Sequence, residues 1–194
     1  MKRLSPFLII ALLLTSCSGK DIRFVPGPGS EVEVLSLKFV FRQENVRQTG
    51  RIHWKFAGGS SSALFLSPMN QVLFELYSQG ENSLLINRRE RVFWEGNFQA
   101  LIRQYWNLSL KLTEIRQIVA EGVVPDEVSA DPAIRIDLFH DSGQSVDRVE
   151  ISGDGSHLTL RILNRETRQG VIVPPSALEK FSRREHIEDV IGRG

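Results

Sequence analysis

Large apolar residues follow two different periods along this chain, and the point where the period changes constrains the fold most. Up to residue 94 they alternate with other residues, which is typical of half-buried β-strands. From Phe98 to Trp106 they fall instead at i, i+3, i+4, i+7 and i+8, which forms one apolar stripe on a helix. Gly122 and Pro125 end the helical part, and the alternation then returns. The pattern therefore predicts strands, one pair of helices, and strands again.

The expected strands are short segments bounded by turn residues. In the first half of the chain they cover residues 35–41, 52–56, 63–66, 72–77, 83–87 and 92–94. In the second half they cover 134–139, 146–151 and 158–163, with 171–173 as one further edge strand before two prolines. Runs of strands around one helical pair indicate an antiparallel sheet with helices on one face. The expected fold class is α+β, mostly β: a curved antiparallel sheet or incomplete β-barrel with a two-helix lid over a hydrophobic cavity.

The two expected helices differ in length and in their first residues. Asn97 is a good N-cap for the first helix, because its side chain can accept a hydrogen bond from an amide of the first turn. Thr113 is a possible cap for the second, shorter helix. The second helix is expected to turn four apolar side chains inward, those of Leu112, Ile115, Ile118 and Val119.

The first seventeen residues have the pattern of a secretion signal that ends at a cysteine. Lys2 and Arg3 precede the apolar run Phe7–Leu14, which is shorter than the roughly 20 residues of a transmembrane helix. Cys17, the only cysteine of the chain, ends the tetrad Leu14-Thr15-Ser16-Cys17. This tetrad resembles the lipobox of bacterial lipoproteins, in which the cysteine is lipidated and becomes the new N-terminus. The alternative is an ordinary cleaved signal with a cysteine nearby by chance.

A lipobox implies that the mature protein is anchored to a membrane outside the cytoplasm, because several acyl chains hold a protein there almost permanently. Ser18, rather than an aspartate, follows the cysteine, which in a Gram-negative cell implies the outer membrane and its periplasmic face. The expected organisation has four parts. They are a signal peptide (1–16), a lipidated N-terminus with a flexible tether (17–30), a half-barrel domain (31–175) and a charged C-terminal tail (176–194).

Composition and motifs argue against several other functions. The net charge of +1 over 194 residues gives no basic excess for binding nucleic acid. With Cys17 acylated, no thiol remains for a disulfide, redox chemistry or a thiolate metal site. Gly58-Gly59-Ser60 lacks the Gly-x-Ser-x-Gly pattern of a hydrolase nucleophile. The histidines are scattered along the chain, at His53, His140, His157 and His186. We therefore expect neither an enzyme nor a metal or other cofactor.

Between Leu64 and Pro125 the chain resembles the LolB family of outer-membrane lipoprotein receptors, within the LolA/LolB superfamily. Residues 64–70 (LFLSPMN) are similar to a family strand that runs into a proline turn. Residues 97–106 and 112–122 are similar to the two lid helices, and 46–56 to the opening strand. The link 57–62 is short and holds no large apolar residue, whereas family members carry a longer protruding segment with a leucine there.

The resemblance implies a lipoprotein that binds acyl chains in a hydrophobic cavity. It also implies that the protein receives lipoproteins from a periplasmic LolA-like carrier and helps insert them into the outer membrane. The alternative is a lipid-binding or structural envelope lipoprotein of the same fold without receptor activity.

Thirteen large apolar residues are candidates for lining the cavity, since broad apolar walls suffice for acyl chains. They are Phe39, Phe41, Trp54, Phe56, Phe65, Phe74, Leu76, Phe93, Phe98, Leu101, Ile102, Tyr105 and Trp106. For any one of them plain core packing is the alternative. The cluster Arg88-Arg89-Glu90-Arg91 could contact lipid phosphates, with a solvated hairpin tip as the alternative.

Overall fold

The structure is a computed structural model that describes residues 24–143, 145–175 and 178–191. The expected signal peptide and Cys17 lie outside the described residues. The strands are β1 (Phe24–Gln43), β2 (Val46–Ala57), β3 (Ser60–Leu66), β4 (Val72–Gln79), β5 (Asn82–Asn87), β6 (Val92–Asn97), β7 (Ile134–His140), β8 (Val146–Gly153), β9 (Ser156–Ile172) and β10 (Ser182–Arg183). The helices are α2 (Phe98–Trp106), α3 (Leu112–Arg116), the π-helical turn η1 (Gln117–Glu121), α4 (Asp126–Ser129), the 3-10 turn η2 (Leu178–Lys180) and α5 (Glu188–Ile191).

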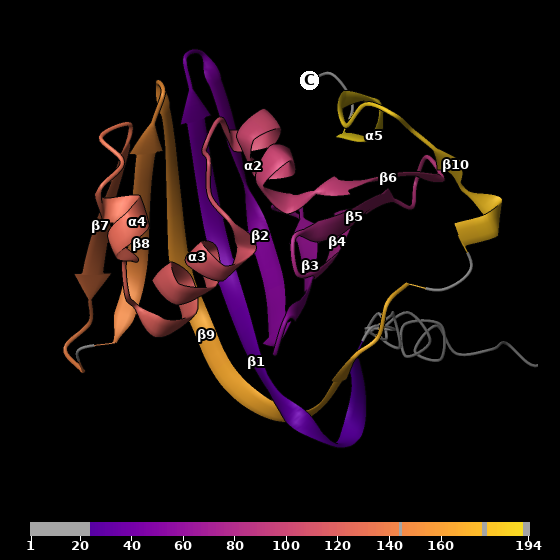
Figure 1. Cartoon of the computed structure of the whole chain (residues 1–194), viewed down its shortest axis with the longest axis horizontal. Helices are drawn as coiled ribbons and strands as arrows, with labels where there is room; N and C mark the ends of the chain where they lie inside the picture. Colours follow the sequence, from indigo (N-terminus) through magenta and orange to yellow (C-terminus); the bar gives the residue numbers. More distant parts are fainter. Residues whose placement is uncertain (1–23, 144, 176–177, 192–194) are drawn as a thin grey trace, which may run out of the picture.

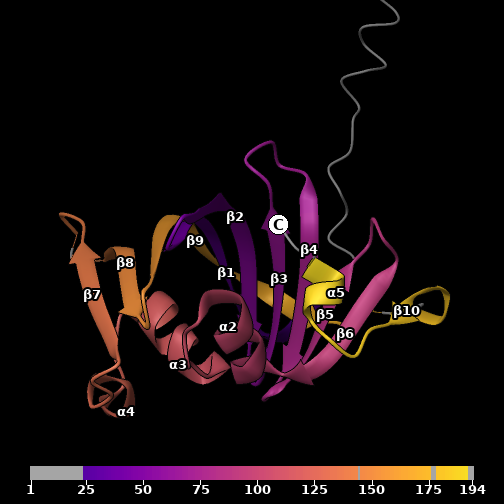
Figure 2. The ribbon, with the colours of Figure 1, turned by 90° about the horizontal axis from the view of Figure 1, so that it is seen from above.

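All described strands belong to one sheet, in the order β10-β6-β5-β4-β3-β2-β1-β9-β8-β7 (Figure 1). Neighbouring strands are antiparallel, except that β10 runs parallel to β6. The sheet is open, because β7 and β10 form its two edges and do not pair with each other. Helices α2 and α3 lie against one side of it, here called the inner face (Figure 2). The expected mostly-β α+β fold with helices on one face is confirmed, and its sheet is open.

The alternation in β1 and β2 determines which side chains form the core. Leu35 lies opposite Trp54 and Leu37 opposite Ile52, and all four are buried on the inner face. Since side chains of a strand alternate between the two faces, the residues between them point to the outer face. His53 is one of these: it is half-buried on the outer face, and its Nδ1 is 3.0 Å from Ser36 Oγ.

The two longest strands extend beyond their expected bounds. β1 begins at Phe24, within the segment that was expected to be a tether, and its first residues pair with the end of β9. A register shift between Pro26 and Ser30 accommodates the residues between them. β9 joins the expected strands 158–163 and 171–173 into one strand. The expectation of a separate strand at 171–173 was wrong, because Val171 and Ile172 are the last residues of β9, where they pair with Val25 and Phe24 of β1.

The helix ends agree with the sequence in one case and differ in the other. Asn97 caps α2 as expected, since its Oδ1 accepts a hydrogen bond from the Ala100 amide at 3.1 Å. Thr113 does not cap α3. The cap position is Lys111, whose amide donates to the Glu114 carboxylate at 2.7 Å. The four side chains expected to face inward, Leu112, Ile115, Ile118 and Val119, are all buried.

Gly50 in β2 is required by a close approach of its neighbours. A Cβ at this position would lie 2.3 Å from the carbonyl oxygen of Leu66 and 2.7 Å from Cε1 of Phe39. Phe39 is the partner of Gly50 in the β1–β2 register, so its ring occupies the space above the glycine. A side chain here would therefore displace either an adjacent backbone or a core aromatic ring.

Residues 178–191 form what we call the C-terminal strap, which passes from the outer face around the β6 edge to the inner face. On the outer side Leu178 lies near Tyr77 and Leu84. β10 then pairs with β6, and the Arg184 amide donates to the Phe93 carbonyl at 2.8 Å. On the inner side Ile187 and Val190 are 1% and 0% exposed within the main core. The expected charged tail thus contributes two buried side chains to the core.

The opposite edge of the sheet, β7, carries an ion pair. Arg135 donates from Nε and Nη2 to the two carboxylate oxygens of Asp137, at 2.9 and 3.1 Å. Both side chains are substantially exposed to solvent. β7 pairs only with β8 among the described residues, so its other side is free.

Candidate functional site

Most of the thirteen candidate lining residues gather in one hydrophobic cluster between the sheet and the helices. Ten of them are buried in it, namely Phe39, Phe41, Trp54, Phe56, Phe65, Leu76, Phe98, Leu101, Ile102 and Trp106. Phe74 and Tyr105 are partly buried and pack against it. Phe93 does not join the cluster, because the alternation in β6 turns Val92 and Trp94 inward instead.

Eight residues surround a small space inside this cluster, which we call the apolar site. They are Phe65, Phe74 and Leu85 from the sheet, Leu101, Ile102, Tyr105 and Trp106 from α2, and Ile191 from α5. The volume of the space is about 20 Å³. This is room for about one water molecule, so the site cannot hold an acyl chain in this structure, and we call it closed in that sense.

Aromatic contacts join α2 to the sheet at this point. The rings of Phe65 and Trp106 have centroids 6.2 Å apart, and Phe65 also meets Phe39 edge-on at 6.5 Å. The rings of Trp54 and Phe56 stack at 5.0 Å but do not line the apolar site. Six of the thirteen candidates therefore line the site, and the other buried ones pack the core around it.

The Tyr105 hydroxyl is held at the edge of the site by a single hydrogen bond. It donates to Oε1 of Gln48, on β2, at 2.8 Å. Burial raises the pKa of Tyr105 to about 12, because the charged phenolate would lose its hydration. The hydroxyl therefore stays neutral, and remains a donor, at physiological pH.

Trp106 brings an unsatisfied donor to the apolar site. Its indole nitrogen is buried and has no hydrogen-bond partner among the described residues, and the same is true of Trp54. An unpaired buried donor costs about 1–3 kcal/mol. Of the two, only Trp106 belongs to the lining of the apolar site, whose exposed surface is entirely apolar in this structure.

Sequence reasoning missed two of the lining residues, Leu85 and Ile191. Leu85 belongs to an expected strand and lies opposite Trp94 of β6, which also faces inward. The alternation alone could therefore have placed Leu85 on the inner face. Ile191 follows a charged stretch and belongs to a helix of four residues. So short a helix gives no periodic signal, and nothing local in the sequence indicates its contact with α2.

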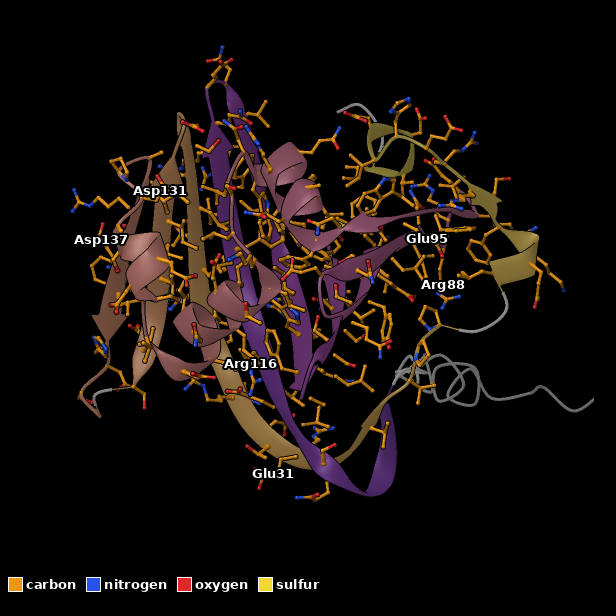
Figure 3. The ribbon with its side chains drawn as sticks, in the orientation of Figure 1. Glu31, Arg88, Glu95, Arg116, Asp131 and Asp137 are labelled. Carbon is orange, nitrogen blue, oxygen red and sulfur yellow. The ribbon has the colours of Figure 1, made fainter. Side chains whose placement is uncertain are left out.

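The arginine cluster lies on the exposed turn between β5 and β6. Arg88 forms an ion pair with the Glu75 carboxylate, while Arg89 and Arg91 are exposed. Figure 3 places Arg88 and Glu95 at this end of the molecule, away from α3 and its Arg116. The cluster is thus a solvated hairpin tip and does not contribute to the apolar site.

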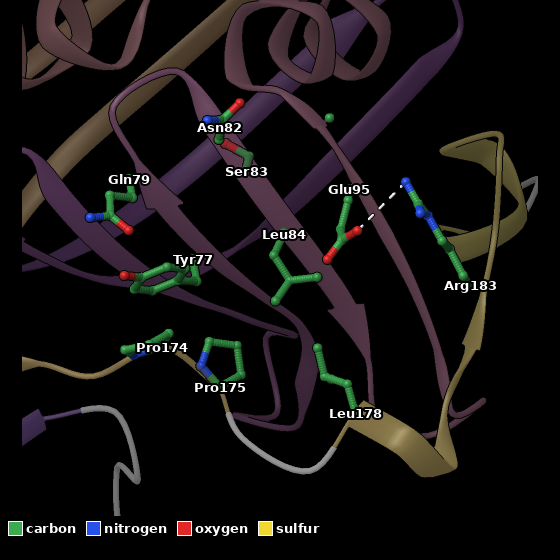
Figure 4. A pocket seen from close by; sticks show the side chains of 11 residues that line it. Tyr77, Gln79, Asn82, Ser83, Leu84, Glu95, Pro174, Pro175, Leu178 and Arg183 are labelled. Atoms are coloured by element: carbon green, nitrogen blue, oxygen red, sulfur yellow. Dashed lines mark ion pairs between the residues drawn. The ribbon is translucent and has the colours of Figure 1, made fainter.

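A wide groove lies on the outer face and is separate from the apolar site. Its volume is about 550 Å³, and Tyr77, Leu84, Pro174 and Pro175 form much of its wall (Figure 4). An ion pair of 3.6 Å between Glu95 and Arg183 crosses one side of it. The groove is wide and mixed in polarity, unlike the closed apolar site.

Within the described part of the chain, no three His, Cys, Asp or Glu side chains are grouped so that they could hold a metal ion. No described helix combines the length and the apolar character needed to cross a membrane.

Comparisons with known proteins add a similarity of fold. No family model matches the chain, and no curated protein matches it. Among solved structures, it is similar to a LolA superfamily protein from Nitrosomonas europaea, at 7% sequence identity and a TM-score of 0.38. The match covers 81% of this chain and 92% of that protein. These values do not establish a family, so the fold class stands on the sheet topology described above.

Proposed function

We propose that this chain is an outer-membrane-anchored lipoprotein of the LolA/LolB type that binds acyl chains in the apolar site. It would receive lipoproteins from a periplasmic carrier and help insert them into the outer membrane. The observation that carries the proposal is the apolar site itself: eight apolar or aromatic side chains under α2, with one unpaired indole donor among them. The lipobox-like tetrad and the resemblance of residues 64–125 to LolB proteins support it.

Acyl binding at this site would need no chemical step. Apolar surface leaving water contributes about 25 cal/mol per Å², which suits broad walls of leucine, isoleucine and phenylalanine. The Trp106 N–H would donate to the ester or amide carbonyl that joins an acyl chain to its head group. Because the site is closed, binding is coupled to an opening motion, and the observed affinity is reduced by the cost of that motion.

The hairpin between β3 and β4 supports the proposed role in membrane insertion. Met69 at its tip is 84% exposed, and Val72 and Leu73 are exposed beside it. The preceding link, at Gly58 and Gly59, is a tight turn without an apolar side chain. Exposed apolar groups of this kind mark surfaces that contact membranes or partners. In the LolB family the segment that corresponds to the link 57–62 is longer and carries an exposed leucine. We therefore propose that in this chain Met69, on the next hairpin, contacts the bilayer instead.

The proposed anchor can be tested separately from the proposed site. Changing Cys17→Ala should release the protein from the membrane fraction, because no lipid can be attached there. Fractionation of cells that express the variant checks this, with the wild-type chain as control. A variant that remains in the membrane fraction would contradict the anchoring.

The proposed site is tested by native mass spectrometry of the full chain extracted gently from membranes. We expect bound lipid or acylated peptide in addition to the covalent anchor, and its loss when Leu101→Asp places a charge in the site. Depletion of the protein in its host then tests receptor activity. Accumulation of lipoproteins before the outer membrane would support it, and normal sorting would contradict it.

A second function is favoured by one observation, the small volume of the apolar site. A space of about 20 Å³ suits a structural envelope lipoprotein whose core is filled by its own side chains. That function predicts that no acyl ligand is found by mass spectrometry and that no acyl probe binds at any concentration below its solubility limit.

A further inference from the structure

A groove on the surface adjoins the closed apolar site. It has a volume of about 190 Å³ and lies between α2, α5 and the first hairpin. Its walls are Phe41, Gln43, Val46, Gln48, Gln104, Tyr105, Ile187, Glu188 and Ile191. Tyr105 and Ile191 also line the apolar site, so these two side chains are shared by the groove and the inner space.

We propose that this groove is the entrance through which an acyl chain reaches the apolar site, and that Tyr105 and Ile191 form its gate. The inference rests on the proposed function and names the path and the class of ligand for the same site. When both side chains swing aside, the groove and the apolar site become one continuous pocket.

The two gate residues belong to helices, whereas the walls on the other side of the apolar site are paired strands. The Tyr105 side chain makes one hydrogen bond, to Gln48, and its ring lies 5.8 Å from that of Trp106 between centroids. Ile191 is the last residue of α5, a helix of four residues, and helices this short are not stable without tertiary contacts. In contrast, Phe65 and Leu85 belong to strands that are paired on both sides.

The strap is fastened near the gate by two side-chain hydrogen bonds. Asn87 Nδ2 donates to the Val190 carbonyl at 2.9 Å, and Gln104 Nε2 donates to the Glu188 carboxylate. The second of these joins α5 directly to α2 on the groove side. Movement of α5 away from α2 would break that bond and withdraw Ile191 from the apolar site in the same motion.

The groove also indicates the head group of the ligand. Its polar lining consists of the amides of Gln43, Gln48 and Gln104 and the carboxylate of Glu188, with no lysine or arginine among the described lining residues. Amides donate to and accept from neutral ester, amide and hydroxyl groups, whereas Glu188 repels an anion. The geometry therefore favours an acyl chain with a neutral, oxygen-rich head group over a free fatty acid.

The test compares association rates of a fluorescent monoacylglycerol, measured by stopped flow with the full chain carrying Cys17→Ala. We expect Ile191→Ala and Tyr105→Phe to bind the probe at least threefold faster than the parent. Ile191→Trp should bind it at least threefold more slowly, because a larger side chain fills the entrance. Gln48→Leu, which leaves Tyr105 in place but removes its acceptor, should also bind faster.

Val171→Ala is the matched control, because Val171 is an exposed apolar residue near the end of β9 and lines neither space. Thermal unfolding of each variant identifies any that fails to fold. Gln48→Leu, on β2, tests the gate without altering the strap. If the parent binds the probe and all gate variants bind at its rate, the gate is wrong while acyl binding stands. If the parent binds no acyl probe at all, the proposed function fails and the gate with it.

A second arm tests the head group and its source. We expect the monoacylglycerol to bind at least fivefold more tightly than a fatty acid of equal chain length, and Glu188→Gln to reduce this ratio. Equal affinities for the two probes in the parent would overturn the head-group preference. A peptide with an N-terminal diacylglyceryl cysteine has the same ester chemistry. Tighter binding of this peptide than of the monoacylglycerol would identify lipoproteins as the source, and the reverse order would identify free lipid.

Discussion

At the scale of single residues, the unpaired indole N–H groups of Trp54 and Trp106 can be compared directly. Both Trp54 and Trp106 are buried without an acceptor among the described residues, but only Trp106 lines the apolar site. A buried donor that is left unpaired is unfavourable, and a ligand carbonyl that accepts from it removes this cost. Of the two tryptophans, only Trp106 borders the space in which we propose that a ligand binds.

We predict that Trp106→Phe lowers the affinity for an acyl ester about three- to tenfold, which corresponds to the loss of one hydrogen bond of about 1 kcal/mol. Trp54→Phe should leave the affinity unchanged. Equilibrium titration with a fluorescent monoacylglycerol measures both variants, with a hydrocarbon lacking the carbonyl as second ligand. Equal losses for the ester and the hydrocarbon would show that Trp106 contributes packing and no hydrogen bond.

Lys55 carries a charge on the outer face of β2 although its residue is only 6% exposed. Burial, with a smaller contribution from the nearby Arg168, lowers the pKa of Lys55 to about 8, while Glu166 acts in the opposite direction. In the unfolded chain the pKa is the ordinary 10.5. Between these two pH values the unfolded chain binds more protons than the folded one, so the free energy of unfolding rises with pH.

The measurement for Lys55 is urea unfolding at pH 7.5 and pH 9.5. We predict that the wild-type chain gains about 1–2 kcal/mol over this interval relative to Lys55→Met, which cannot titrate there. Tyr105 is present in both proteins, so any contribution from its titration cancels in the comparison. An equal pH dependence of the two proteins would mean that the pKa of Lys55 is not lowered.

At the scale of elements, the register of β1 and β2 depends on the absence of a side chain at Gly50. Two other elements meet there, the Phe39 ring from β1 and the Leu66 carbonyl from β3. Gly59 in the β2–β3 turn is the opposite case, since a Cβ there would have no atom within 4 Å and its φ is not positive.

We predict that Gly50→Ala lowers the free energy of unfolding by about 2 kcal/mol or more, as expected for overpacking in a core. Gly59→Ala should be neutral or slightly stabilising, because it reduces only the freedom of the unfolded chain. Chemical denaturation of both variants checks the pair. Similar values for the two would show that β2 and β3 separate readily at Gly50.

The sequence pattern was sufficient for some elements and insufficient for others. The alternation identified the strands, and the 3.6-residue period identified α2 together with its cap Asn97. The candidate list contained six of the eight residues that line the apolar site, but its other seven members do not line it. An apolar residue in a strand reveals which face it occupies, but its depth in the core depends on the elements that cover it. Phe39 and Trp54 face the same side as Phe65, yet only Phe65 reaches the apolar site.

At the scale of the whole molecule, the strap is the feature that sequence reasoning could not find. Ile187 and Val190 are two apolar residues in a charged stretch, and their contacts are with strands about a hundred positions earlier in the chain. Asn87, for example, bonds to the carbonyl of Val190. Contacts of this kind leave no local pattern, because they depend on where the sheet ends and how the chain passes around its edge.

The strap and the central strands should differ in the rate of amide hydrogen exchange. We predict that peptides covering residues 178–191 exchange at least tenfold faster than peptides from the middle of β1 and β9, because β10 and α5 contribute few backbone hydrogen bonds. A bound acyl ester should change exchange in the strap and leave β1 unchanged. Mass spectrometry with and without the ester measures this, and a strap as protected as β1 would contradict it.

An open sheet has two edges at which another polypeptide could add a strand, and the two edges of this sheet are protected in different ways. One side is shielded by β10, whose backbone occupies the first residues of β6. The other edge strand, β7, has no partner on its outer side among the described residues, but it carries the ion pair of Arg135 and Asp137. Charged side chains on an edge strand disfavour pairing with a strand from another chain. The chain can thereby leave the strand β7 free at the edge of its sheet without polymerising with other copies of itself.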